Sequence, residues 1–92
     1  MKLGGWNYDE VKSCALPQKA ASPFIAVTSD LVGVEYKPVL YAGRQQVKGT
    51  NYCIIALQTS VTASPSSRLM KLVINESPDG KYSLHSVELI PM

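Results

Sequence analysis

Few residues of this chain are of the types that carry out catalysis. His85 is the only histidine, so every serine–histidine or cysteine–histidine pair would have to use it, and it lies in the strand-like segment YSLHSVEL. Gly43 and Gly49 are not followed by the lysine and hydroxyl of a phosphate-binding loop. The seven carboxylates show no spacing that would pair a general acid with a base: Asp9, Glu10, Asp30, Glu35, Glu76, Asp79 and Glu88. The sequence therefore predicts a protein that is not an enzyme and needs no cofactor.

Cys14 and Cys53 are the only cysteines. One pair cannot build the disulfide framework of a small secreted domain, so two interpretations stay open: buried free thiols in a reducing compartment, or a single Cys14–Cys53 bridge. With no CxxC spacing and one histidine, a structural zinc site is excluded and no metal site is expected.

The composition limits the partners. The chain has 92 residues, 46% of them apolar, which suits one domain over residues 1–92 with a single small core. Its formal charge is +2, and the nine basic residues are scattered rather than grouped beside aromatics, which argues against nucleic acid. No apolar run approaches the ~20 residues that span a bilayer, and MKLGGW lacks the apolar stretch of a secretory signal. We expect no membrane partner, and a cytoplasmic protein as written or a secreted one if a leader has been removed upstream.

The chain from Val34 to Ile90 has the composition of an antiparallel meander, because β-branched and aromatic residues alternate with glycine, serine and proline clusters. We predict strands at 34–46, 50–60, 68–76 and 81–90. The residues 47–49 form a tight turn, 62–67 a looser loop, and 77–80 a turn in which Pro78 fixes φ and Gly80 supplies conformational freedom.

Apolar residues recur at helical spacing in the first third of the chain: Leu16, Ala20, Phe24, Val27 and Leu31. Pro17 suits a first helical turn, whereas Pro23 inside a helix removes a hydrogen bond. The spacing predicts one helix within 16–32, bent or irregular near Ser22, and a short strand at 6–11 precedes it.

The strand pattern also distinguishes two faces of the sheet. Met70, Leu72 and Ile74 point to one face, the core face, which the helix covers. The run Cys53–Leu57 does not alternate, which indicates a central strand that is partly apolar on its outer face as well. We interpret that outer face as a candidate self-association surface.

Val47 is an apolar residue at the tip of a polar hairpin, and exposed apolar groups that cluster mark interaction sites. In the predicted meander, the turns at 47–49 and 77–80 fall at the same end of the sheet. An N-terminal arm containing Leu3, Gly4 and Gly5 is expected at this end too.

This arrangement resembles the cystatin and stefin family of cysteine-protease inhibitors. The resemblance rests on Gly4 and Gly5 followed by Trp6, on QQVKG at 45–49, which fits the QxVxG signature, and on the Ser77–Pro78 turn. It implies an α+β fold with a four- to five-stranded antiparallel sheet wrapped around one helix. It also implies reversible occlusion of the cleft of papain-like proteases by three segments, with these protease-binding residues: Leu3, Gly4, Gly5, Gln45, Gln46, Val47, Lys48, Gly49, Ser77, Pro78 and Asp79.

The chain departs from the family in several places. The predicted helix contains Pro23 and is shorter than the family's usual one, and Lys48 replaces a small residue at the hairpin tip. The cysteines of secreted cystatins are missing, so the chain looks like the disulfide-free stefin type. A rival interpretation is a cystatin-fold binding or structural module without protease inhibition. We expect a monomer, and a domain-swapped dimer could form through the hairpin 43–52.

Overall fold

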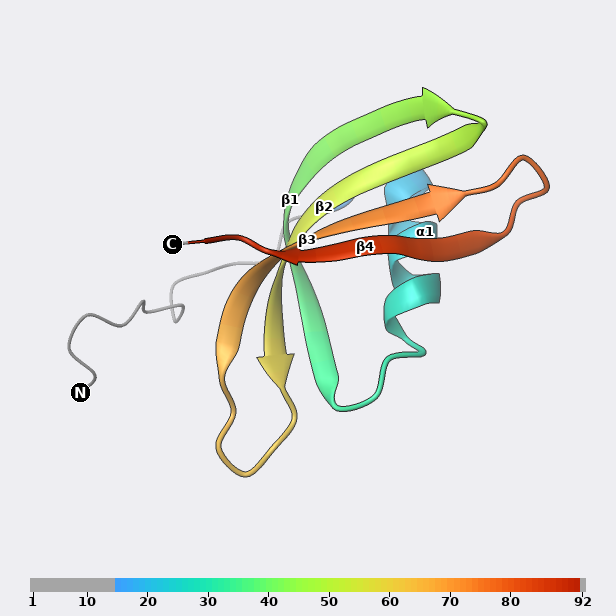
Figure 1. The fold of residues 1–92 in the computed structure, drawn as a ribbon. Coiled ribbons are helices and arrows are strands. Elements are labelled where there is room, and N and C mark those ends of the chain that lie inside the picture. The colour runs from blue at the N-terminus through green and yellow to red at the C-terminus, as the bar shows by residue number, and fades with distance from the viewer. Residues whose placement is uncertain (1–14, 92) are drawn as a thin grey trace.

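The computed structural model describes residues 15–91, which form one helix and a four-stranded antiparallel sheet, an α+β arrangement (Figure 1). The elements are α1 (Gln18–Thr28), β1 (Val34–Val47), β2 (Gly49–Ser60), β3 (Ser67–Glu76) and β4 (Tyr82–Leu89). Each strand pairs with the next, and α1 lies against the face of the sheet that β3 and β4 form (Figure 1). The predicted strands are confirmed to within one residue at each end. Residues Leu3, Gly4, Gly5 and Cys14, and the strand predicted at 6–11, lie outside the described residues.

The core lies between α1 and the inner face of the sheet. Its members alternate along β2 and β3 and recur at intervals of four along α1, as the two backbone periods require. The buried cluster consists of Ala20, Phe24, Tyr52, Ile54, Ala56, Met70, Leu72 and Ile74, with Leu16 and Val27 packed against it. The predicted core face of β3 and most of the predicted helical stripe are therefore confirmed.

Two prolines shape α1. Pro17 precedes the helix with φ −54° and ψ 146°, and its carbonyl accepts hydrogen bonds from the amides of Ala20 and Ala21, both at 2.9 Å. Pro23 lies inside the helix and is fully buried, so its ring adds to the core while its missing N–H removes one helical hydrogen bond. All eleven residues of α1 are α-helical, so the irregularity predicted near Ser22 does not interrupt the helix.

Strand β1 contains two irregularities that the sequence-based prediction of one uninterrupted strand missed. The register of β1 against β2 shifts between Pro38 and Leu40, and again between Tyr41 and Gly43. Each shift inserts one residue and reverses which side chains face inward. Between the shifts, Tyr41 packs against the core and Leu40 is 55% exposed on the outer face. The second shift restores the original alternation before the strand reaches its end at Val47.

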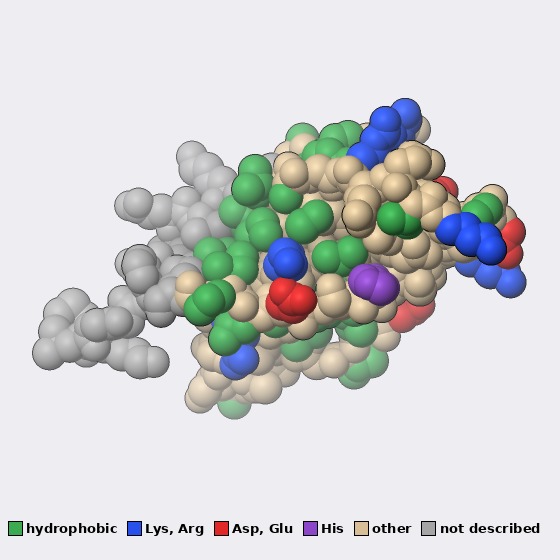
Figure 2. Space-filling view, turned by 45° about the horizontal axis from the view of Figure 1, so that its top comes forward, with side chains coloured by type: hydrophobic (Ala, Val, Ile, Leu, Met, Phe, Trp, Pro, Cys, Tyr) green, Lys and Arg blue, Asp and Glu red, His purple; other side chains and the backbone are tan. Residues whose placement is uncertain are grey.

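The outer face of the sheet, opposite α1, is partly apolar, as the run Cys53–Leu57 predicted. Leu57 is only 7% exposed although it lies outside the core cluster. Figure 2 shows this face, where apolar side chains surround one basic and one acidic side chain that lie side by side. Lys71 and Glu88 form an ion pair at 3.2 Å across β3 and β4. Self-association through this face stays a prediction.

The two faces differ in how much they contribute to stability. We expect Leu72→Ala to lower the free energy of unfolding by about 2–5 kcal/mol, since Leu72 is completely buried in the core. Leu69 lies on the same strand but on the outer face, where it is half-buried. Leu69→Ala should therefore lower the free energy of unfolding by less than about half of the Leu72→Ala loss. Urea unfolding followed by circular dichroism measures both, and equal losses would contradict the assignment of the core to the helix side.

Candidate functional site

The first turn is as short as a hairpin turn can be. Strands β1 and β2 stay paired as far as Val47 and Gly49, so Lys48 alone occupies the apex. Gly49 has a φ of +98°, a conformation that residues with a Cβ rarely adopt. Val47 is 42% exposed, and Gln45, Gln46 and Lys48 are exposed around it. The predicted tight turn with an exposed apolar residue at its tip is therefore confirmed.

The second turn, between β3 and β4, is fixed by hydrogen bonds along its whole length. The amide of Gly80 donates to the carbonyl of Ser77 at 2.9 Å, and the amide of Ser77 donates to the carbonyl of Lys81 at 2.9 Å. The hydroxyl of Ser77 accepts from the amide of Lys81 at 3.1 Å and donates to the carboxylate of Asp79. Pro78 fixes one φ, and Gly80 takes the positive φ of +85° that closes the turn. The turn predicted at 77–80 is thus confirmed.

The two turns lie at the same end of the sheet (Figure 1). Thr50 pairs with Glu76, which places the start of β2 beside the end of β3. A Cβ added to Gly49 would lie 2.2 Å from the carbonyl oxygen of Glu76 and 3.2 Å from the Cα of Ser77. Only glycine allows the two backbones to approach so closely. The structure therefore brings residues 45–49 and 77–79 together, and we call these residues the two-turn edge.

A buried tyrosine connects β2 to the end of β3, next to the contact between the two turns. Tyr52 on β2 is 4% exposed, and its hydroxyl donates a hydrogen bond to Oε1 of Glu76 at 2.9 Å. Burial, followed by this hydrogen bond to Glu76, raises the pKa of Tyr52, so the phenol remains a neutral donor. Sequence reasoning missed this pair. The available signal was a tyrosine at a core position, because a buried hydroxyl usually needs a hydrogen-bond partner.

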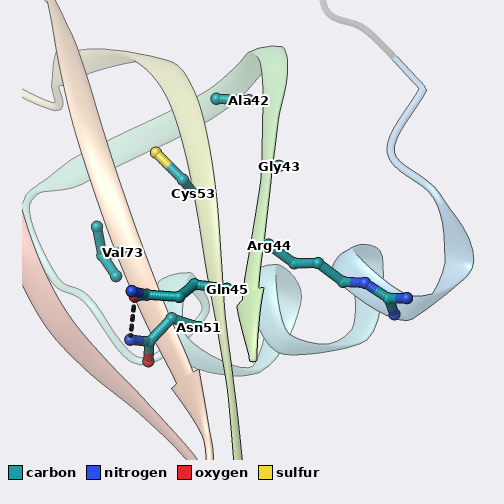
Figure 3. Close-up of a pocket in the computed structure, with 7 residues that line it drawn as sticks. All are labelled: Ala42, Gly43, Arg44, Gln45, Asn51, Cys53 and Val73. Carbon is teal, nitrogen blue, oxygen red and sulfur yellow. Dashed lines mark hydrogen bonds between the residues drawn. The ribbon is translucent and has the colours of Figure 1, made fainter. Parts of the chain in front are cut away.

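Amide side chains connect three strands on the outer face below the first turn. Asn75 on β3 donates to Oδ1 of Asn51 on β2 at 2.8 Å, and Asn51 donates to Oε1 of Gln45 on β1 at 3.4 Å. Gln45 and Asn51 border a depression of about 280 Å³ that is also lined by Cys53 and Val73. Figure 3 shows Gln45, Asn51, Cys53 and Val73 on one side of the sheet and Arg44 extending to the other. Cys53 is a half-buried thiol with no disulfide partner among residues 15–91. Because Cys14 lies outside these residues, free thiols and a Cys14–Cys53 bridge both stay predictions.

Two further observations concern residues 15–91 as a whole. These residues contain no group of three or more histidine, cysteine, aspartate or glutamate side chains placed to hold a metal ion. No helix among them has the length and apolar character that crossing a membrane requires. The two-turn edge presents exposed groups suited to binding: the apolar Val47 lies beside the charged apex residue Lys48, in a turn whose backbone packs against the second turn.

Comparison with known protein families, curated proteins and solved structures gives no match. The resemblance to cystatins and stefins therefore rests on the residues of the chain itself. Of these, 45–49 and 77–79 lie within the described part of the structure.

The contact at Gly49 can be tested against a matched glycine. We expect Gly49→Ala to lower the free energy of unfolding by more than about 2 kcal/mol, because the methyl group adds a clash with Glu76 to the cost of a positive φ. Gly80→Ala should cost only about 1–2 kcal/mol, since a Cβ at Gly80 meets nothing within 4 Å. Urea unfolding and the amide chemical shifts of residues 76–81 provide the readouts. Equal costs with no shift changes would contradict a tight contact.

The Tyr52–Glu76 hydrogen bond can be tested against a similar bond at the opposite end of the sheet. There, the side-chain amide of Gln58 donates to the hydroxyl of Tyr36. We expect Tyr52→Phe and Tyr36→Phe each to lower the free energy of unfolding by about 0.5–1.5 kcal/mol. Only Tyr52→Phe should change the amide chemical shifts of residues 76–80. Identical shift changes in both variants would show that Tyr52 does not fix the second turn.

Proposed function

We propose that this protein is a reversible inhibitor of papain-like cysteine proteases and has a cystatin-like fold. In this proposal, the two-turn edge enters the active-site cleft together with the arm Leu3–Gly5. By the match to the family motif, Val47 packs against the cleft wall beside the catalytic cysteine. Ser77, Pro78 and Asp79 contact the primed side of the cleft. The arm passes the nucleophile without offering it a well-placed peptide bond, so no covalent step is involved.

One observation carries this proposal: the QxVxG turn and the Ser–Pro turn, about thirty residues apart in the sequence, touch through Gly49. A chance match to QxVxG gives no reason for its last glycine to be required by a second turn. Here Gly49 is required by the backbone of Glu76 and Ser77. The last glycine of the motif is therefore also the residue that lets the two turns pack against each other.

The physical properties of the edge suit tight occlusion of a cleft. The second turn is held by hydrogen bonds and proline, and the first turn has a single apex residue, so neither loses much conformational freedom on binding. Val47 presents an apolar surface that gains free energy when a cleft wall removes it from water. A binding or structural module with the same fold would need neither the exposed valine nor the contact between the turns.

Titration of papain with the purified protein tests the proposal directly. We expect inhibition that is complete, reversible on dilution and established at submicromolar concentration. The absence of inhibition at micromolar concentration would contradict the proposal and would favour the module without inhibitory activity.

Two neighbouring substitutions test the orientation of the edge. We expect Val47→Asp to weaken inhibition of papain more than about 100-fold, because it places an unpaired carboxylate in an apolar cleft. Lys48→Ala should weaken it far less, and both variants should unfold at nearly the wild-type urea concentration because both sites are exposed. Equal losses of inhibition would show that Val47 does not enter the cleft.

A further inference from the structure

The apex of the first turn carries a positive charge that the described residues do not neutralise. Lys48 is exposed and stands alone between the paired residues Val47 and Gly49. It has no ion-pair or hydrogen-bond partner among residues 15–91, whereas Lys81, at the second turn, lies 3.8 Å from the carboxylate of Asp79.

The carboxylates at this end of the molecule already have partners of their own. Glu76 accepts the hydrogen bond of Tyr52, and Asp79 accepts the hydrogen bond of Ser77 besides lying near Lys81. Arg44, which is also exposed, adds a further positive charge to the end of β1. Figure 2 shows basic groups, with acidic ones beside them, at the end of the molecule that carries the two turns. The edge thus presents a net positive tip in which the apex charge is available to a partner.

A cleft that accepts Val47 must also accommodate the ammonium group one residue further on. In a neutral, apolar cleft wall this group would lose hydration without gaining a partner, which disfavours binding. A carboxylate on the wall would restore the lost interaction as a charge-assisted hydrogen bond and would speed the encounter of the two proteins.

We propose that Lys48 selects among papain-like proteases, and that the preferred target carries a carboxylate on the cleft wall that faces the first turn. This inference rests on the proposed function, since it takes the two-turn edge to be the part that enters the cleft. The specificity it describes comes from one side chain at the apex, separate from the apolar contact of Val47 that all targets would share.

The experiment compares Lys48→Glu with Arg68→Glu, which changes the net charge equally. Arg68 is exposed and lies near the start of β3, eight residues and roughly 26 Å along the strand from Glu76, so it is a distant control. Inhibition constants and association rates are measured at low and high salt against a panel of papain-like proteases. For the most tightly inhibited protease, we expect Lys48→Glu to weaken inhibition about 30-fold or more, and Arg68→Glu by less than about threefold.

A charge exchange then identifies the partner group. Replacing the facing carboxylate of the preferred protease by lysine should restore inhibition by the Lys48→Glu variant and weaken inhibition by the wild type. The inference is overturned if Lys48→Glu leaves the ranking of the panel unchanged, or if Arg68→Glu has the same effect. Failure of the proposed function looks different, because the wild-type protein would then inhibit no member of the panel.

Discussion

The close approach of Gly49 to the backbone of Glu76 is the constraint on which the candidate site depends. It joins two turns that belong to different hairpins, and no side chain can be inserted between them. Below this contact, Tyr52 donates to Glu76, and the amides of Asn75 and Asn51 connect the same pair of strands on the opposite face. The two turns are therefore held together by contacts between β2 and β3 on both faces of the sheet.

The rest of the fold positions this edge and gives it a rigid support. Helix α1 covers the inner face of β3 and β4, and the core that it closes contains Tyr52 and Ile74, which are neighbours across β2 and β3 near the turns. The core and the candidate site thus occupy different parts of the molecule. The core supplies the free energy of folding, while Val47 and Lys48 remain exposed at the tip, where they contribute little to the core and are available to a partner.

Much of the architecture follows from local patterns. The alternation in β3 and the composition of the turns predicted four strands to within one residue, because side-chain alternation and turn chemistry are properties of short segments. Strand β1 shows the limit of such reasoning. Pro38 and Gly43 border the two register shifts, and proline and glycine are typical of bulges, yet only the pairing with β2 shows that the alternation reverses twice. The inward direction of Tyr41 and the outward direction of Leu40 depend on that pairing.

The sequence by itself determined the order of the elements, the two glycine-containing turns and the exposed valine at position 47. These features arise from residues close together in the chain, where φ preferences and hydrophobic periodicity act. Only the tertiary structure decided that the backbone of Glu76 leaves no room for a side chain at position 49 and that the hydroxyl of Tyr52 donates to the carboxylate of Glu76. It also decided that Lys48 has no partner among residues 15–91. The contacts of Glu76 with Gly49 and Tyr52 depend on the register between β2 and β3, which brings together residues more than twenty positions apart in the sequence.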